Sequence, residues 1–492
     1  MLKRIRQVLA ALSIVAIMLL FLDFTGTVHQ WWGWMAKIQF LPALMAVNVG
    51  VIIALIVATL IFGRLYCSII CPLGIMQDGF GWLGKKMKKN RYSYSTAKSI
   101  LRYTMLCITI IAIIFGISVI VTLLAPYSAF GRIVQNILSP LWQTGNNILA
   151  GMSERADNYM FYSVDVIWVK SAITLTVALA TLVILGVLAW RNGRTYCNTI
   201  CPVGTILGFF AKYSYLKPLI DTTKCNSCGL CARNCKSSCI NSKEHTIDYT
   251  RCVGCMDCIG KCHKNAISYT HKVKATEPST DAHDNTRRQF MSIGATLLAT
   301  AAVKATEKTV DGGLAAIVDK KIPNRETHLV PPGAKSIRNM SSHCTACQLC
   351  VAVCPNGVLR PSSNMERMMQ PESSYEKGYC RPECTKCSEV CPTGAICKIT
   401  VAEKSSIQIG HAVWVKDNCV PLTDGYECGN CARHCPTGAI TMMPSDASDE
   451  TSPKIPTVNV EKCIGCGACE NLCPARPFSA IYVEGHENHR VI

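Results

Sequence analysis

The chain has 492 residues, 31 cysteines, 17% charged residues and a formal net charge of +18. Its mean hydropathy of +0.23 and the long uncharged runs in its first part exclude an ordinary soluble protein. The cysteines are too numerous for ordinary thiols, and most lie in clusters of fixed spacing that a disulfide framework does not require. The composition therefore indicates a membrane metalloprotein. We predict no nucleic-acid partner, because aromatic residues do not interleave the basic ones.

Four uncharged apolar segments predict membrane-spanning helices, since a span needs about 20 apolar residues. They cover residues 7–22, 38–63, 103–125 and 171–190. The first segment could instead be a secretory signal, but no small-residue cleavage site follows it, so we interpret it as an anchor. Basic residues concentrate before the first segment, after the second and after the fourth. This distribution places those regions in the cytoplasm and predicts a multi-pass protein of the cytoplasmic (inner) membrane.

The motif G-R-x-Y-C-x₃-C-P-x-G occurs twice, starting at Gly63 and at Gly193. Each copy follows a pair of predicted spans, so residues 1–219 predict a four-helix membrane domain of two parallel two-helix repeats. Cysteines four positions apart share one helix face, and symmetry would bring the two pairs to the same depth. The four cysteines are Cys67, Cys71, Cys197 and Cys201. They could bind a further metal or cluster or form two dithiol pairs, and plain packing is the alternative.

Two runs of the type C-x₂-C-x₂-C-x₃-C follow, starting at Cys225 and Cys252. Three thiolates of such a run bind one cubane and the fourth reaches the other cluster. We therefore predict a cytoplasmic α+β ferredoxin-like 2[4Fe–4S] domain over residues 220–272. The two ligand sets are Cys225, Cys228, Cys231 and Cys262, and Cys252, Cys255, Cys258 and Cys235. Cys239 could replace Cys235. Structural zinc is the alternative, but a zinc knuckle does not use a third cysteine in each run.

Residues 273–304 predict a polar linker that ends in Arg287, Arg288 and a short Ala-rich apolar stretch. This pattern resembles a twin-arginine export signal; an amphipathic surface helix is the alternative. An export signal here would place residues 305–492 in the periplasm, and cleavage near 301–305 is left open.

Four more cysteine runs predict a polyferredoxin domain over residues 305–492 with four clusters, which makes six [4Fe–4S] clusters in all. The runs comprise Cys344, Cys347, Cys350 and Cys354; Cys380, Cys384, Cys387 and Cys391; Cys419, Cys428, Cys431 and Cys435; and Cys463, Cys466, Cys469 and Cys473. Each run ends in Cys-Pro. Cys107, Cys239 and Cys397 remain outside the runs, and packing is the expected role for each.

On these motifs, residues 1–270 resemble the NapH family of membrane polyferredoxins, and residues 286–492 resemble NapG, an exported four-cluster ferredoxin. The resemblance implies a fused quinol dehydrogenase module with menaquinol as substrate and a redox partner, a periplasmic reductase or cytochrome. It also suggests that the last four runs nest, first with fourth and second with third. The nested sets are Cys344, Cys347, Cys350 and Cys473; Cys463, Cys466, Cys469 and Cys354; Cys380, Cys384, Cys387 and Cys435; and Cys419, Cys428, Cys431 and Cys391.

Many cluster ligands without a hydride-cofactor motif predict an electron-transfer subunit with quinol oxidation activity. Asp23 and His29, beside a group of tryptophans, are weak candidates for quinol binding, because a carboxylate within the membrane is a functional suspect. The alternative is an interfacial aromatic belt. A second functional reading is a membrane-bound cupric reductase or assembly factor that uses the C-x₃-C-P cysteines, since related membrane ferredoxins reduce copper.

Overall fold

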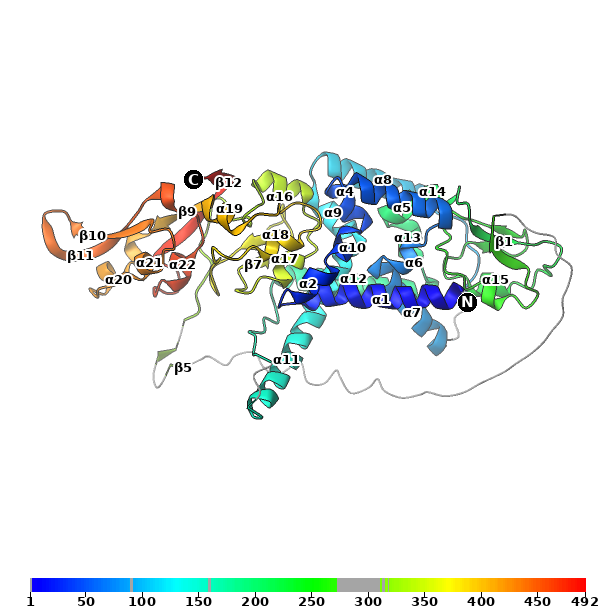
Figure 1. The fold of residues 1–492 in the computed structure, drawn as a ribbon, viewed down its shortest axis with the longest axis horizontal. Coiled ribbons are helices and arrows are strands. Elements are labelled where there is room, and N and C mark those ends of the chain that lie inside the picture. The colour runs from blue at the N-terminus through cyan, green and yellow to red at the C-terminus, as the bar shows by residue number, and fades with distance from the viewer. Residues whose placement is uncertain (1, 89–91, 158–160, 272–309, 312–314, 317) are drawn as a thin grey trace.

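The structure is a computed structural model of the chain (Figure 1). It describes all residues except 1, 89–91, 158–160, 272–309, 312–314 and 317. The predicted linker at 273–304, with its twin-arginine pattern, lies outside the described residues.

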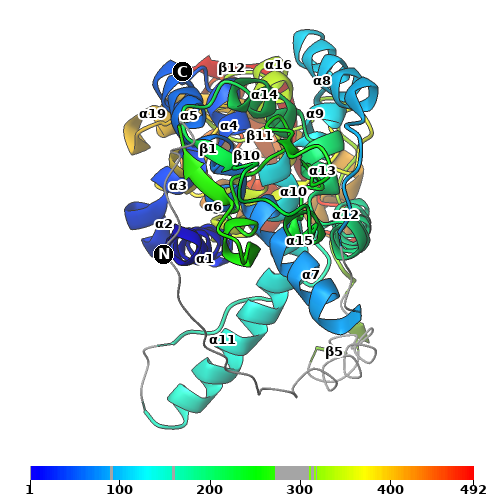
Figure 2. The same ribbon diagram turned by 90° about the vertical axis from the view of Figure 1, so that its right-hand side faces the viewer.

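The described residues between 2 and 211 form helices and connecting loops. In chain order the helices are α1 (Leu2–Leu22), α2 (Thr27–Trp32), α3 (Trp34–Lys37), α4 (Phe40–Met45), α5 (Val49–Phe62), α6 (Tyr66–Ile69), α7 (Pro72–Lys88), α8 (Ser99–Ile114), α9 (Ser118–Leu124), α10 (Pro126–Ile133), the π-helix η1 (Val134–Leu138), α11 (Ser139–Glu154), α12 (Ala172–Asn192), α13 (Thr195–Thr199) and α14 (Pro202–Ala211). Helix α11 projects away from the others (Figures 1 and 2).

Helices α1 and α12 correspond to the first and fourth predicted spans. Each has 21 residues, which at 1.5 Å per residue gives about 31 Å, enough for a hydrocarbon core of about 30 Å. A third candidate is the pair Ser118–Leu124 and Pro126–Glu154, which is bent by 74°. Among the described residues, two helices, or three with this bent pair, are long and apolar enough to cross a membrane. This number is smaller than the four spans predicted.

The second and third predicted spans are each interrupted. Segment 38–63 divides into α4 and α5, because Val47 has a left-handed φ of 51° and Asn48 then caps α5. Segment 103–125 divides into α8 and α9 at Gly116, whose φ is 69°. Left-handed residues do not continue an α-helix, so apolar composition alone overestimated the length of both helices.

The two copies of the repeated motif are equivalent in structure. Each copy starts a short helix, α6 or α13, and the proline after the second cysteine begins the next helix, α7 or α14. Proline suits this first helical position, where its missing N–H is not needed. The helix that follows each motif packs against the apolar helix that precedes the other motif: α7 packs against α12, and α14 packs against α5. The helical domain formed by these elements is thus a pseudo-twofold arrangement around the two motifs.

The first ferredoxin domain, residues 217–270, contains two small antiparallel sheets. One pairs β1 with β4 and the other pairs β2 with β3. Its elements are β1 (Lys217–Ile220), α15 (Leu230–Asn234), β2 (Ile240–Asn241), β3 (Thr246–Ile247), η2 (Ile259–Lys261) and β4 (Ile267–Thr270). The sheet β1–β4 joins the two ends of the domain, which closes it around its cysteines.

The C-terminal module, residues 318–492, consists of short helices and three two-stranded antiparallel sheets, β7–β8, β9–β12 and β10–β11. Its elements are α16 (Ile337–His343), α17 (Leu349–Ala352), β7 (Leu359–Pro361), β8 (Pro371–Ser373), α18 (Lys386–Val390), α19 (Val401–Ser406), β9 (Ile407–Trp414), η3 (Lys416–Asn418), α20 (Val420–Thr423), α21 (Asn430–Arg433), β10 (Ile440–Asp446), β11 (Asp449–Val458), η4 (Val460–Lys462), α22 (Ala468–Leu472) and β12 (Ile481–Val491). Two further short strands, β5 (Val310–Asp311) and β6 (Ala315–Ala316), precede it.

The first ferredoxin domain and the C-terminal module lie at opposite ends of α1 (Figure 1). Near the start of α1, Lys3 Nζ forms an ion pair with Asp257 Oδ1 at 2.9 Å. Beyond its last residue, Thr25 O accepts a hydrogen bond of 3.1 Å from Lys386 Nζ. One helix of membrane-spanning length therefore separates the two cysteine-rich regions.

Candidate iron–sulfur sites and the buried cysteine group between them

Group I gathers four cysteines around one cavity in the first ferredoxin domain. The chain turns at Gly229, with a left-handed φ of 71°, so that cysteines on both sides of the turn line the same cavity of about 140 Å³. The four are Cys225, Cys228, Cys231 and Cys262. The structure thus brings together the set that the swapped-ligand rule assigned to one cluster.

Group II lines a second cavity of the same domain and contains one cysteine more than predicted. Its members are Cys235, Cys239, Cys252, Cys255 and Cys258. The Sγ atoms of Cys235 and Cys239 are 3.5 Å apart, and Cys239 is 1% exposed. Both alternatives for the fourth ligand therefore lie at the site, and Cys239 is not a remote packing residue.

Groups IV and V belong to the first half of the C-terminal module. Group IV consists of Cys344, Cys347, Cys350 and Cys391, and group V consists of Cys354, Cys380, Cys384 and Cys387. The nested pairing, which gave these runs Cys473 and Cys435 as fourth cysteines, is wrong. The physical reason is the β7–β8 pair, in which Leu359 lies opposite Ser373. It folds the second run back onto the first.

Groups VI and VII form the second half of the module in the same way. Group VI consists of Cys435, Cys463, Cys466 and Cys469, and group VII of Cys419, Cys428, Cys431 and Cys473. The nested sets had placed Cys354 and Cys391 here, and this too is wrong. The hairpin β10–β11, with Ile440 opposite Val458, brings the fourth run beside the third. In both halves of the module, the fourth cysteine of one run therefore joins the first three cysteines of the neighbouring run.

The chemistry of these groups fits iron–sulfur clusters. Burial, with the nearby Cys391 thiol, raises the pKa of Cys347 to about 12, and burial likewise raises that of Cys466 to about 12. Such thiols become thiolates when a metal replaces their protons. Among the described residues, no three Cys, His, Asp or Glu side chains converge on a single-ion site. A [4Fe–4S] cluster takes one cysteine thiolate at each of its four iron atoms, and groups I and V each bring four cysteines to one cavity.

Group III is the meeting point of the two repeated motifs. Its members are Cys67, Cys71, Cys197 and Cys201, each 4% exposed, and their thiols lie within electrostatic range of one another. The structure therefore brings together the four cysteines that the repeat predicted to lie at one depth. Gln77, from α7, adds a polar contact, because its Nε2 lies 3.4 Å from Cys197 Sγ.

Two arginines border group III, and sequence reasoning missed both. Arg64 Nη2 lies 3.8 Å from Cys67 Sγ, and Arg194 Nη1 lies 3.9 Å from Cys197 Sγ. Both arginines are 0% exposed. Burial raises the pKa of Cys197 and the two guanidinium groups oppose that rise, so they would stabilise the negative charge of thiolates bound to a metal centre. The signal was present in the sequence, since each motif carries an arginine three residues before its first cysteine.

Groups II and III are joined by direct contacts. Arg64 Nη1 donates to the carbonyl of Thr250 at 2.9 Å, two residues before Cys252 of group II. The backbone N–H of Arg194 donates to the carbonyl of Lys236 at 2.8 Å, next to Cys235. The first ferredoxin domain therefore packs on the same two arginines that border group III.

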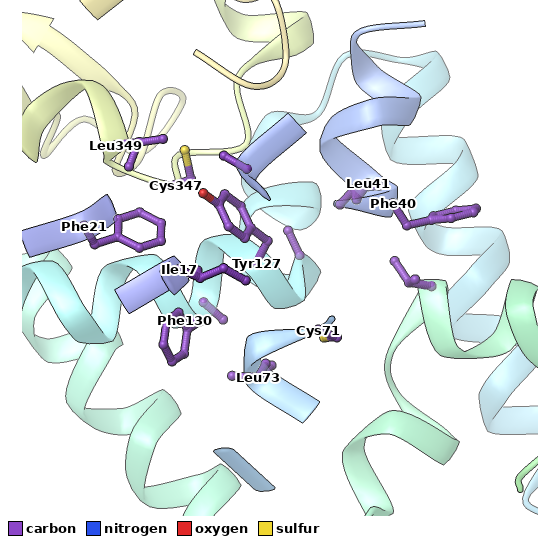
Figure 3. Packing of buried hydrophobic residues seen from close by; sticks show 14 of the residues in the cluster. Ile17, Phe21, Phe40, Leu41, Cys71, Leu73, Tyr127, Phe130, Cys347 and Leu349 are labelled. Atoms are coloured by element: carbon purple, nitrogen blue, oxygen red, sulfur yellow. The ribbon is translucent and has the colours of Figure 1, made fainter. Parts of the chain in front are cut away.

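Groups III and IV are joined through α10. The guanidinium of Arg132 lies within electrostatic range of both Tyr196, beside group III, and Cys347 of group IV. Figure 3 shows Tyr127 between Cys71 and Cys347, and its ring centroid is 5.4 Å from that of Phe21. One continuous hydrophobic core contains these residues. The C-terminal module is thereby packed directly against the helices that surround group III.

The structure brings Asp23 and His29 together. Asp23 Oδ2 lies 3.1 Å from His29 Nδ1, and Oδ1 accepts hydrogen bonds from Thr25 and Gly26. The carboxylate thus organises the loop between α1 and α2, which supports a structural role. His29 Nε2 is buried without a hydrogen-bond partner among the described residues.

Comparison with known protein families agrees with these groups. A model described as "4Fe-4S binding domain" matches residues 44–90 and 174–219, the two motif copies. Two models described as "4Fe-4S dicluster domain" match residues 343–396 and 426–476. These two ranges contain groups IV and V and most of groups VI and VII, so each half of the C-terminal module matches a two-cluster unit.

Similar proteins also carry names of this class. The chain is 25% identical to the putative electron transport protein YccM of Escherichia coli over 45% of this chain and 55% of YccM. It is 34% identical to the methylamine utilization ferredoxin-type protein MauM of Methylobacillus flagellatus over 30% of this chain and 64% of MauM. It is 25% identical to the ferredoxin-type protein NapF of Escherichia coli over 32% of this chain and 86% of NapF. The chain thus spans between half and two thirds of YccM and MauM. No solved structure matches it.

The fold, the cysteine groups and these similarities define an iron–sulfur electron-transfer protein of the ferredoxin type. It contains several [4Fe–4S]-binding domains on one chain, together with apolar helices of membrane-spanning length.

Proposed function

We propose that this protein is a transmembrane electron conduit, which oxidises menaquinol and passes electrons through iron–sulfur clusters to a redox partner across the membrane. The observation that carries the proposal is the position of group III. It lies between the first ferredoxin domain and the C-terminal module, along a helix that is about 31 Å long. A bound [4Fe–4S] cluster supplies a carrier for one electron. The protein's own residues set the order of such carriers.

The order of the cysteine groups along the molecule supports a single path for electrons from group I to group VII. Cys258 of group II neighbours Cys231 of group I, and Cys350 of group IV neighbours Cys387 of group V. The remaining junctions follow the same pattern: Cys380 N donates to Cys466 O at 2.9 Å between groups V and VI, and Cys469 of group VI neighbours Cys431 of group VII. Figure 1 shows the elements that carry the groups in this sequence from right to left.

The sides of the membrane follow from charge and length. The basic N-terminus favours the cytoplasm for the start of α1 and for the first ferredoxin domain beside it. A helix long enough to span the hydrocarbon core supports a periplasmic position for the C-terminal module. We propose six clusters in groups I, II and IV–VII and a further centre in group III.

Group VII is the proposed outlet to a periplasmic reductase or cytochrome. It lies farthest from the membrane helices in Figure 1, and Tyr426, two residues before Cys428, is 74% exposed. An exposed aromatic residue beside a redox site is suited to contact with a protein partner.

The alternative function, reduction of cupric ions at the C-x₃-C-P cysteines, has less support. Group III is enclosed, since each of its cysteines is 4% exposed and the first ferredoxin domain packs over the adjoining arginines. A site that exchanges copper needs an entry path. The enclosure favours a resident centre.

The decisive experiment measures electron flow across a sealed bilayer. The purified protein is reconstituted into vesicles that contain ferricyanide, and dithionite, which does not cross the bilayer, is added outside. We expect ferricyanide reduction at least tenfold faster than in protein-free vesicles. The double variant Cys67→Ser/Cys197→Ser should lose this rate, whereas Cys107→Ser, an exposed cysteine outside the groups, should retain it. A rate equal to that of empty vesicles contradicts the proposal.

The topology has its own test. Protease added to intact spheroplasts should degrade residues 318–492 and leave residues 217–270 protected until the membrane is lysed. Protection of both regions would place all clusters in the cytoplasm.

A further inference from the structure

We propose that the cleft between α1 and α7 is the quinol-binding site of this protein. This inference rests on the proposed function and deepens it by locating the electron donor. The cleft has a volume of about 450 Å³, within the range of about 300–1,000 Å³ that is typical of small-molecule sites. Its walls come from one face of α1, from α7 and from the first ferredoxin domain.

The cleft has an apolar end and a polar end. Ala11 and Ile14 of α1 and Ile75 of α7 line the apolar end, and α1 is one of the helices of membrane-spanning length. Lys3 and Asp257 line the polar end, at the start of α1. A ligand with a polar ring and an apolar isoprenoid tail matches this division, because its tail can extend along the membrane-spanning helix while its ring meets polar groups.

Gln77 supplies the unsatisfied group that points to such a ligand. Its side chain is 1% exposed and lines the cleft. Its Nε2 contacts Cys197 Sγ at 3.4 Å, while its Oε1 is buried without a hydrogen-bond partner among the described residues. Buried polar atoms are almost always paired, so this oxygen is suited to accept a hydrogen bond from a quinol hydroxyl group.

The two carboxylates of the cleft are held in ion pairs with cations around them. Asp78 Oδ1 lies 2.6 Å from Arg194 Nε, and Asp78 Oδ2 lies 2.7 Å from Lys236 Nζ and 3.4 Å from Arg6 Nη1. Asp257 pairs with Lys3 at 2.9 Å. Lys85 and Lys261 also line the cleft and have no ion pair among the described residues, so the polar end keeps a net positive charge and a phospholipid headgroup is the competing ligand that the test must separate from a quinol.

The site lies between two electron acceptors. Gln77 joins it to group III through Cys197, and Lys236, which follows Cys235 in the chain, joins it to group II. Oxidation breaks the two O–H bonds of the quinol and yields a quinone, two electrons and two protons. Redox centres held by the cysteines of groups II and III would accept the electrons one at a time, and the protons would leave to water at the polar end beside Lys3.

Asp78 acts as a positioning residue in this site. Burial alone would raise the pKa of its carboxyl group, but Arg194 and Lys236 hold that pKa well below its usual range. The carboxylate therefore stays charged and holds Arg194 against group III. Gln77 Oε1, which carries no charge, is the acceptor that faces the ligand.

The test combines binding with electron transfer. A photoreactive azido-naphthoquinone is bound to the full-length protein and the labelled peptides are identified by mass spectrometry. Label on α1 or α7 supports the site; label confined to residues 23–34 would overturn it in favour of the loop of Asp23 and His29. This measurement needs no electron transfer, so it remains informative if the conduit proposal fails.

The kinetic arm uses Ala11→Trp, which fills the apolar end. Ala11 is exposed, so the larger side chain does not enter the protein core. We expect the KM for a short-chain naphthoquinol to rise at least tenfold, while reduction by dithionite stays unchanged. Val8→Trp is the matched control, because Val8 is 58% exposed on the same helix and outside the cleft. An unchanged KM in Ala11→Trp overturns the proposal, as does a tightly bound phospholipid that Ala11→Trp displaces.

Discussion

Arg64 and Arg194 each reach from one repeat of the helical domain to the other repeat. Arg64 Nη2 donates to the carbonyl of Cys197 at 3.2 Å, and Arg194 Nη1 donates to the carbonyl of Cys67 at 2.5 Å. Each guanidinium thus reaches across the pseudo-twofold axis to the first cysteine of the other motif. Each guanidinium also lies against the first cysteine of its own motif, so the two arginines tie the repeats together around group III.

Loss of Arg194 should destabilise the membrane domain more than loss of Arg64. Arg194 is fully buried and pairs with Asp78 at 2.6 Å, and breaking a buried ion pair from one side costs roughly 3–5 kcal/mol. We expect Arg194→Gln to lower the Tm in detergent more than Arg64→Gln, and Asp78→Asn to recover part of the loss in the double variant. Arg191→Gln, at an exposed position of α12, is the control. Equal decreases in Tm for Arg194→Gln and Arg64→Gln would contradict the stabilising role assigned to the ion pair between Arg194 and Asp78.

The glycine that ends each motif should tolerate no side chain. A Cβ at Gly74 would lie 2.4 Å from Cys67 O, and a Cβ at Gly204 would lie 2.2 Å from Cys197 O. Gly74→Ala and Gly204→Ala should each cost about 1–3 kcal/mol through overpacking and lower the metal content of group III. Gly79→Ala is the matched control on α7, where a Cβ meets nothing within 4 Å. It should leave stability equal or higher by about 0.5–1 kcal/mol. Thermal unfolding and metal analysis check both.

Exchange of cysteines between neighbouring runs predicts which half of the C-terminal module each variant disturbs. Cys391→Ser should remove a ligand from group IV and expose residues 337–397 to limited proteolysis. Cys473→Ser should act on group VII and expose residues 407–491 instead. Mass spectrometry of the first cleavage products distinguishes the two regions. If proteolysis first cleaved the same region in both variants, the fourth cysteine of each run would instead belong to a distant run.

Cys239 should substitute for Cys235 in group II. Because the two Sγ atoms are 3.5 Å apart, either can reach the same iron corner with a small side-chain rotation. We expect Cys235→Ser and Cys239→Ser each to retain the iron of group II, and the double variant to lose it. Iron analysis of anaerobically purified protein provides the measurement. Loss of iron in Cys235→Ser alone would assign Cys239 to packing.

The C-terminal module should lose stability on mild acidification. Burial, with Arg367 nearby, lowers the pKa of His328 to about 4, below its ordinary value of about 6.5. Between these values the unfolded chain binds a proton that the folded chain does not, so stability falls as the pH decreases through this window. His328→Gln should flatten the dependence of Tm on pH between 7 and 5. His434→Gln, at an exposed position, should keep the slope, and identical slopes for wild type and His328→Gln would contradict the assignment.

The amino-acid sequence determined the local parts of this protein. Three cysteines at C-x₂-C-x₂-C spacing form one side of a cluster site within a single loop, so the first three members could be assigned from this spacing in the runs that start at Cys225, Cys252, Cys344 and Cys463. The same holds for the paired C-x₃-C-P motifs, whose repetition predicted the meeting of Cys67 and Cys197. Helices α1 and α12 were also predictable, because each is a continuous apolar segment.

Only the tertiary structure decided the contacts between segments. The fourth cysteine of each run depends on which hairpin folds the chain back, and β7–β8 and β10–β11 bring neighbouring runs together, whereas run spacing is equally compatible with nesting. The breaks at Val47 and Gly116 depend on backbone dihedral angles that apolar composition does not report. The crossing of Arg64 and Arg194 requires two repeats packed face to face. Local spacing therefore specifies what each segment can bind, and packing over long sequence separations specifies which segments share a site.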